Sequence, residues 1–184
     1  MKCDILLNDL LLLTPDVFSD HRGYFFEAYN NKTFSELSNF DSGFVQDNQS
    51  HSRRGVLRGL HLQSPPFGQG KLVRVVRGEI LDVVVDVRSR SKSFGDYCTT
   101  ILNDASGQQL WIPEGFAHGF VVLSETADVI YKTTNYYSPG SELAIRWDDP
   151  FLNIDWCTEE DNLIVSSKDA SALLFHDFCK CNPY

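Results

Sequence analysis

Short strand-like segments separated by turn residues recur along most of this chain, and this pattern constrains the fold more than any other feature. Turn signals fall roughly every 8–12 residues, and few segments have helical periodicity. Such a pattern is typical of an all-β protein, an antiparallel sandwich or barrel. Strands are expected at residues 4–13, 24–29, 44–50, 56–62, 71–76, 79–88, 97–102, 109–112, 120–123, 129–133 and 142–147.

The turn at Arg77-Gly78 lies between two apolar runs, and it predicts a two-residue β-hairpin. In that hairpin Val73 would lie opposite Asp82, and Lys71 opposite Val84. Helices are expected only at residues 32–38 and 170–175. The first strand, 4–13, is expected at an edge of the fold, which a partner subunit could cover.

The composition fits a single domain spanning residues 1–184, with 42% hydrophobic and 22% charged residues. The formal net charge is −9. Nucleic acids and anionic membranes attract basic surfaces, so neither is an expected partner. An anionic small molecule stays compatible, because a few cations in one cleft can outweigh a distant acidic surface.

The cysteines point to a cytoplasmic protein. There are five, dispersed and odd in number, so free thiols in a reducing compartment are expected. The longest aliphatic run, residues 10–13, is far too short to span a membrane and follows no basic n-region. The last residues, 176–184, are expected to form a frayed tail.

Residues 46–71 concentrate polar and basic groups that could converge on a small anionic ligand. Gln46 and Asn48 share one face of a strand because strand side chains alternate. Arg58 and His61 are three positions apart and should point to opposite faces. Gly59 between them permits a bulge that re-aims one of the two. A second loop, residues 111–120, adds His118.

Each of these residues also has an ordinary structural interpretation. His61 suits a general base but could be a hydrogen-bonded core residue. Tyr131, between apolar neighbours, could be a core tyrosine, and Lys71 a solvated strand end. Asp169 is explained by its place near a helix N-terminus, where Ser166 precedes it at capping-box spacing.

A metal site is not expected. A metal-binding barrel of this type would have an HxH pair, a following glutamate and a later histidine. Gln63 occupies the second position of the pair, and no glutamate follows at a suitable spacing. Acid–base chemistry without metal is therefore favoured.

The motifs together resemble the dTDP-4-dehydrorhamnose 3,5-epimerase family over residues 4–174. The most specific are RGLHLQ and LWIPEGFAHGF. The others are DHRGYFFEAY, FVQDNQSHS, QGKLVRVVRGEILDVVVDVR, SFGDY, YKTTNYYSP and SKDASA. The resemblance implies a cupin jelly roll that needs no metal or cofactor and forms a homodimer through N-terminal strands, about residues 1–30.

The family's reaction inverts C3 and C5 of dTDP-4-dehydro-6-deoxy-D-glucose and gives dTDP-4-dehydro-L-rhamnose. By resemblance, His61 is the base, Asp169 orients it, Tyr131 is the acid and Lys71 binds near the C4 oxygen. Tyr137 matches the aromatic residue that stacks on thymine. Other positions that match substrate contacts are Arg22, Glu27, Gln46, Asn48, Arg58, His118, Glu142 and Lys168.

Three rival functions remain open at this point. A mono-epimerase acting on a related dTDP-4-keto sugar would share these motifs. A non-catalytic carbohydrate-binding protein would be expected to lack the base, its partner or the acid. A metal-dependent dioxygenase would need the ligands that are missing around Gln63.

Overall fold

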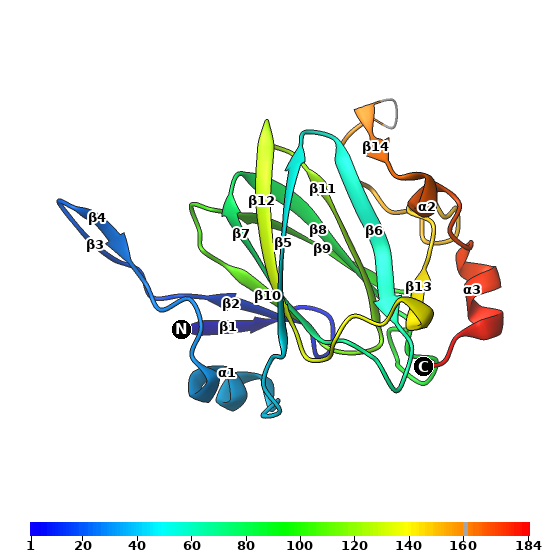
Figure 1. The fold of residues 1–184 in the computed structure, drawn as a ribbon, viewed down its shortest axis with the longest axis horizontal. Coiled ribbons are helices and arrows are strands. Elements are labelled where there is room, and N and C mark those ends of the chain that lie inside the picture. The colour runs from blue at the N-terminus through cyan, green and yellow to red at the C-terminus, as the bar shows by residue number, and fades with distance from the viewer. Residues whose placement is uncertain (160–161) are drawn as a thin grey trace.

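Two packed antiparallel sheets form the body of the protein in the computed structural model, which describes residues 1–159 and 162–184. Their arrangement confirms the predicted all-β sandwich (Figure 1). The first sheet has the order β1 (Lys2–Ile5), β2 (Leu11–Thr14), β10 (Gln109–Ile112), β7 (Lys71–Arg77), β12 (Thr126–Thr133) and β5 (Gln46–Arg53). The second has the order β13 (Glu142–Ala144), β6 (Val56–Gln63), β11 (Phe116–Val122), β8 (Glu79–Asp86) and β9 (Tyr97–Asn103).

The smaller elements lie outside the sandwich. β3 (Phe18–Asp20) and β4 (Gly23–Phe25) form a hairpin that projects away from the body (Figure 1). The helices are α1 (Asn31–Ser38), the short 3-10 helix η1 (Pro139–Ser141), α2 (Ser167–Ala170) and α3 (Phe175–Cys181). β14 (Ile164–Val165) adds one parallel pair to β6. No helix in the described part of the chain is long and apolar enough to cross a membrane.

Strand alternation sorts the apolar side chains into three layers. Val73, Ile80 and Val84 belong to the interior between the sheets. Leu81 and Val83 belong to a second cluster, which the C-terminal segment covers with Trp156, Phe175 and Phe178. The third cluster packs Trp111 of β10 against Phe34 of α1, with ring centroids 5.1 Å apart.

The predicted hairpin between β7 and β8 is wrong, because the two strands belong to different sheets. Val73 lies opposite Leu110 of β10 and Tyr131 of β12, not opposite Asp82. At the connection Gly78 has φ +81°, and its N–H donates to Asp104 Oδ2 over 2.9 Å. A turn signal marks where the chain reverses, but it does not say whether the next strand joins the same sheet.

The same correction applies to Lys71, which lies opposite Ile112 and Thr133 and not opposite Val84. β7 and β8 both have buried apolar residues on their two faces. β7 buries Leu72 on one face and Val73 on the other, and β8 is buried along nearly its whole length. Each therefore needs a packed layer on both faces, which an isolated two-stranded hairpin does not supply.

Several element boundaries differ from the sequence prediction. The expected strand 4–13 is two strands, β1 and β2, joined by a turn in which Asn8 has φ 51°. β1 does lie at a sheet edge, as predicted. The strand expected at 24–29 ends at Phe25. The helix at 32–38 is confirmed as α1, and Asn30 Oδ1 caps it by accepting from Lys32 N over 3.0 Å.

The C-terminal region also departs from expectation. No helix spans 170–175; α2 ends at Ala170 and α3 begins at Phe175. The capping interaction is present, since Ser166 Oγ accepts from Asp169 N over 3.1 Å. Residues 176–184 are not a frayed tail, because Phe178 is fully buried and Asn182 Nδ2 donates to Val87 O over 2.6 Å.

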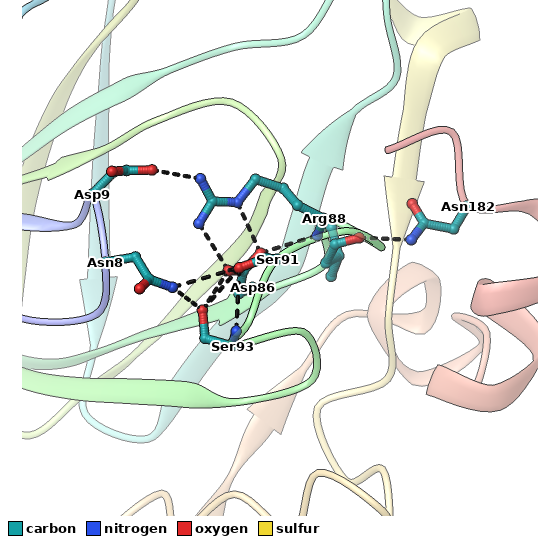
Figure 2. A network of polar contacts seen from close by, with 8 residues as sticks. Asn8, Asp9, Asp86, Arg88, Ser91, Ser93 and Asn182 are labelled. Atoms are coloured by element: carbon teal, nitrogen blue, oxygen red, sulfur yellow. Dashed lines mark hydrogen bonds and ion pairs between the residues drawn. The ribbon is translucent and has the colours of Figure 1, made fainter.

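A buried carboxylate ties the end of β8 to the turn that follows it (Figure 2). Asp86 is fully buried and accepts hydrogen bonds from Arg88 Nε at 2.9 Å, Ser91 Oγ at 2.6 Å and Ser93 Oγ at 2.7 Å. Burial acts to raise the pKa of Asp86, but these hydrogen bonds outweigh it and lower the pKa to about 2. Arg88 also pairs with Asp9, which joins this network to the β1–β2 turn.

Candidate active site

Polar side chains from both sheets line a cavity of about 470 Å³ at one end of the sandwich. A second cavity of about 320 Å³ shares His61, Lys71 and Tyr131 with it, so the two cavities adjoin at these residues. His61 comes from β6 in the second sheet, whereas Lys71 and Tyr131 come from β7 and β12 in the first. Groups on opposite walls can therefore approach the two faces of one bound molecule.

His61 and Asp169 form a hydrogen-bonded pair. His61 Nε2 lies 2.6 Å from Asp169 Oδ1, and Asp169 is buried. Burial acts to raise the pKa of Asp169, but the hydrogen bond from His61 and its other interactions lower it overall, so the carboxylate is ionised. An ionised carboxylate only accepts, which places a His61 proton on Nε2, so in the neutral imidazole Nδ1 is the nitrogen with the free lone pair.

Gly59 explains how Arg58 and His61 reach one cavity. Leu57, Leu60 and Leu62 all belong to the cluster outside the second sheet, while Arg58 and His61 both line the cavity. Regular alternation would not permit this spacing. The pairing of β6 with β11 shifts register at this point, and Gly59 has φ +137°. The departure from strand geometry expected at Gly59 is confirmed.

A close approach of two strands makes the glycine necessary. A Cβ atom placed on Gly59 would lie 2.5 Å from the Cα atom of Gly119 in β11. One placed on Gly119 would lie 2.7 Å from the carbonyl oxygen of Arg58. Neither position has room for a side chain, so β6 and β11 hold His61 and His118 close to each other as paired residues.

Lys71 is a buried cation on the wall opposite His61. It is 9% exposed, and its Nζ donates to the His61 carbonyl oxygen over 3.1 Å. Burial lowers the pKa of Lys71 to about 8, although Asp82 and Glu142 partly oppose the shift. A buried ammonium group of this kind can stabilise negative charge that develops on a bound molecule.

Tyr131 has the properties of a proton donor. It is half-buried, lies opposite Asn48 in the β12–β5 pair and lines both cavities. Burial raises the pKa of the Tyr131 hydroxyl above its usual value, while Arg58 opposes this shift. The hydroxyl therefore keeps its proton at neutral pH.

His118 has a carboxylate partner that sequence reasoning missed. His118 Nε2 lies 2.8 Å from Oδ2 of Asp82, which is fully buried on β8. Asp82 Oδ1 has no hydrogen-bond partner within residues 1–159 and 162–184. The available signal was Asp82 inside the apolar run 80–85, because a buried charge needs a partner. The loop predicted at residues 111–120 is wrong here, because His118 lies on β11 and is oriented in the cavity wall.

The second cavity gathers the amides and the exposed aromatic residue. Gln46 Nε2 donates to Asn48 Oδ1 over 2.9 Å, and Gln46 Oε1 accepts from Tyr137 N over 3.0 Å. Tyr137 is 54% exposed, and its hydroxyl donates to Glu142 Oε2 over 2.8 Å. Lys168 Nζ donates to the same oxygen over 2.6 Å.

Arg58 lines the first cavity and brings a guanidinium group to its wall. Its Nε and one terminal nitrogen both donate to Ser52 Oγ, over 3.2 and 3.1 Å. Ser50 follows Asn48 on the same face of β5 and lines the cavity. Its buried Oγ has no hydrogen-bond partner among the described residues. The two serines extend the row of polar groups that Gln46 and Asn48 begin.

Arg22 and Glu27 are not brought to the cavity within this chain. Arg22 lies at the turn of the β3–β4 hairpin, with 79% of its side chain exposed, and pairs with Asp20 at 2.6 Å. Glu27 accepts from Asn30 Nδ2 over 3.1 Å. Neither residue lines the two site cavities.

The described residues contain no cluster of three or more histidine, cysteine, aspartate or glutamate side chains placed to hold a metal ion. The histidines of the cavity instead pair with carboxylates, His61 with Asp169 and His118 with Asp82.

Comparison with known proteins gives consistent results. The family described as dTDP-4-dehydrorhamnose 3,5-epimerase matches residues 4–177. An enzyme of that name from Salmonella typhimurium is 52% identical over 166 residues, which cover 90% of each chain.

Two solved structures extend this similarity to the fold. One is the Legionella pneumophila dTDP-6-deoxy-D-glucose-3,5-epimerase in complex with dTDP-4-keto-L-rhamnose, with TM-score 0.91 and 46% identity over 95% of this chain and 93% of that one. The other is a 3'-monoepimerase from Streptomyces bikiniensis in complex with dTDP-quinovose. It has TM-score 0.88 and 30% identity over 95% of this chain and 88% of that one. The cupin jelly roll implied by the resemblance is thereby confirmed.

Proposed function

This chain belongs to the dTDP-4-dehydrorhamnose 3,5-epimerase family, and we propose that it inverts C3 and C5 of dTDP-4-dehydro-6-deoxy-D-glucose. One observation carries the proposal. A base-and-carboxylate pair, His61 and Asp169, shares a cavity with a buried cation, Lys71, and a protonated phenol, Tyr131, on the opposite sheet.

Proton removal is the first half of the reaction. The protons on C3 and C5 flank the C4 ketone, so removing either one gives an enolate whose charge rests on the C4 oxygen. His61 Nδ1 is the base, because Nε2 already donates to Asp169. Lys71 stabilises the enolate oxygen, since a buried ammonium group needs little rearrangement as the charge develops.

Proton return must occur on the other face of the sugar ring if the centre is to be inverted. Tyr131 meets this requirement, because it belongs to the first sheet and His61 to the second. Its raised pKa keeps the proton on the hydroxyl until the enolate carbon accepts it. His118, fixed by Asp82, would hold a hydroxyl or carbonyl of the hexose in the same cavity.

The nucleotide would reach both cavities, with Arg58 in the first and Tyr137 in the second. Arg58 would bind the diphosphate, because a guanidinium group matches the geometry of phosphate oxygens. Exposed Tyr137 would stack on thymine, with Gln46, Asn48, Glu142 and Lys168 beside it.

A homodimer would complete the site. The β3–β4 hairpin projects from the body and exposes Phe18, Tyr24 and Phe25, each at least 65% accessible in the single chain (Figure 1). A second copy would bury these side chains and receive Arg22 and Glu27 near its own cavity. The five free cysteines suit a reducing cytoplasm.

Solvent deuterium incorporation tests the proposal. In deuterated water the purified protein should label dTDP-4-dehydro-6-deoxy-D-glucose at both C3 and C5, as followed by NMR. His61→Ala should abolish exchange at both positions, and retained exchange at either carbon would remove His61 as the shared base. Label at one carbon only would favour a mono-epimerase, the activity of the similar Streptomyces protein.

A further inference from the structure

The side-chain amide of Gln63 holds the backbone on both sides of Tyr137. Gln63 is 4% exposed, at the end of β6. Its Nε2 donates to the carbonyl oxygen of Tyr136 over 3.2 Å, and its Oε1 accepts from Ser138 N over 2.8 Å. The same Nε2 donates to Phe67 O over 2.6 Å, which ties in the loop after β6. Both polar atoms of the amide are thus used on backbone groups.

Gln63 in turn is held by the C-terminal segment. The Tyr184 hydroxyl donates to the Gln63 carbonyl oxygen over 2.6 Å, and Ser89 N donates to Tyr184 O over 3.2 Å. The contact joins residues 121 positions apart in the sequence. Burial of its ring raises the pKa of the Tyr184 hydroxyl to about 12, so the hydroxyl remains a donor throughout the neutral range.

Tyr137 needs this support because its own ring has little packing. The side chain is more than half exposed, and its described polar contacts are Gln46 at the backbone N–H and Glu142 at the hydroxyl. Residues 134–141 carry no strand and only the short η1 helix. An aromatic side chain on such a loop stacks well only if the loop is held in place before the ligand arrives.

We propose that Gln63, braced by Tyr184, is a positioning residue that presets the Tyr137 loop for the thymine of the substrate. This inference rests on the proposed function, because it takes the nucleotide as the ligand of Tyr137. It assigns Gln63 a different role from the neighbouring site residues. Gln63 lines the second cavity, but both polar atoms of its amide are used on backbone groups, so its effect on the ligand is expected to pass through Tyr137.

The test is a double-mutant cycle on nucleotide affinity. Gln63→Met keeps the length of the side chain but leaves two backbone carbonyls without their donor, and it should weaken dTDP binding about tenfold by calorimetry. Tyr184→Phe should weaken it about threefold. In a Tyr137→Ala background, Gln63→Met should change the dTDP affinity by less than about twofold, because the residue through which it acts is gone.

Kinetics separate positioning from a general loss of structure. Gln63→Met should raise KM for the dTDP-sugar about tenfold while kcat at saturation stays within about twofold. Gln108→Met is the control for the glutamine-to-methionine change itself, since Gln108 Nε2 donates a hydrogen bond to Thr14 Oγ1 and the residue lies outside both cavities. It should leave KM unchanged.

Three results would overturn the inference. They are a fall in kcat with unchanged KM, an equal effect of Gln63→Met with and without Tyr137, and a raised KM in the Gln108 control. An unaltered protein that bound no dTDP would overturn the proposed function, and the inference with it. Tight binding by the unaltered protein with additive losses would overturn the inference alone.

Discussion

Replacing Lys71 by methionine should make the protein more stable and much less active. Its pKa is lowered from 10.5 to about 8 by burial, which corresponds to about 3 kcal/mol spent on holding the ammonium group in the folded protein. Methionine fills similar volume without charge, so Lys71→Met should gain up to about 3 kcal/mol in unfolding free energy at pH 7. It also removes the cation opposite the enolate, and kcat should fall by roughly 10²- to 10³-fold.

The pH dependence gives the sign of both effects. The unfolded chain binds more protons than the folded one between pH 8 and pH 10.5, so the Lys71 contribution to stability rises with pH in that window. The gain from Lys71→Met is therefore largest below pH 8 and disappears by about pH 10.5. Activity changes in the opposite direction, because the free enzyme loses the cation above pH 8.

Two assays check these statements. The first follows kcat/KM by deuterium incorporation between pH 6 and pH 10; the wild type should fall above about pH 8, and Lys71→Met should lack this alkaline limb. Tyr131 does not account for the limb, because burial raises its pKa above the usual value of 10.0. The second is urea unfolding at pH 7 and pH 9.5.

Lys180→Met serves as a control in both assays. Lys180 lies on α3, with 63% of its side chain exposed and paired to Asp177. The change should leave the pH profile of kcat/KM unchanged. It should also keep the unfolding free energy within about 0.5 kcal/mol of wild type. A Lys71→Met protein that kept the alkaline limb, or that was less stable than wild type at pH 7, would refute the reasoning.

Three further predictions concern two buried carboxylates, Asp169 and Asp86, and the β3–β4 hairpin. Asp169→Asn should lower kcat by roughly 10²- to 10⁴-fold with little change in KM, because the amide no longer holds the His61 proton on Nε2; the steady-state pH profile of the variant measures this. Asp86→Asn should lose about 2 kcal/mol at pH 7, and since the folded pKa is below 3.8, the difference from wild type should shrink as pH falls from 4 toward 2 in urea titrations. Mixing Arg22→Ala with His61→Ala protein should restore up to about a quarter of wild-type activity if a partner's hairpin completes each site, whereas no recovery would place Arg22 outside the site.

The strands and the chemistry of the site were largely predictable, while the pairing of strands was not. Alternation identified most of β5 to β12 because each has a buried and a more exposed face, or is apolar throughout. The first residues of β11 were predicted to be a loop. Tyr131 and His61 reach one cavity only through the packing of the two sheets, which local periodicity does not report. The resemblance to a known family supplied that link, and the geometry of Gly59 agrees with it.

Partners that depend on long-range contacts escaped prediction. Asp82 pairs with His118 across two strands, and Gln63 holds a loop more than 70 residues away, as seen in its 2.8 Å bond with Ser138. Neither contact has a signature in the local sequence beyond a polar residue in an apolar run. The outlying positions of Arg22 and Glu27 likewise follow from a hairpin that leaves the body of the protein.

The crossing of the chain at Gly78 from one sheet to the other has a consequence for folding. Strands β7 and β8 are neighbours in sequence, yet they do not pair with each other. β7 pairs with β10 and β12, which lie far along the chain, and β8 pairs with the next strand, β9, and with the more distant β11. Forming contacts between segments far apart in the sequence costs loop-closure entropy before the contacts stabilise the fold. The chain is therefore expected to fold slowly. His61 and Tyr131 meet only when both sheets have closed, and recovery of epimerase activity on refolding should therefore trail recovery of the β-sheet signal.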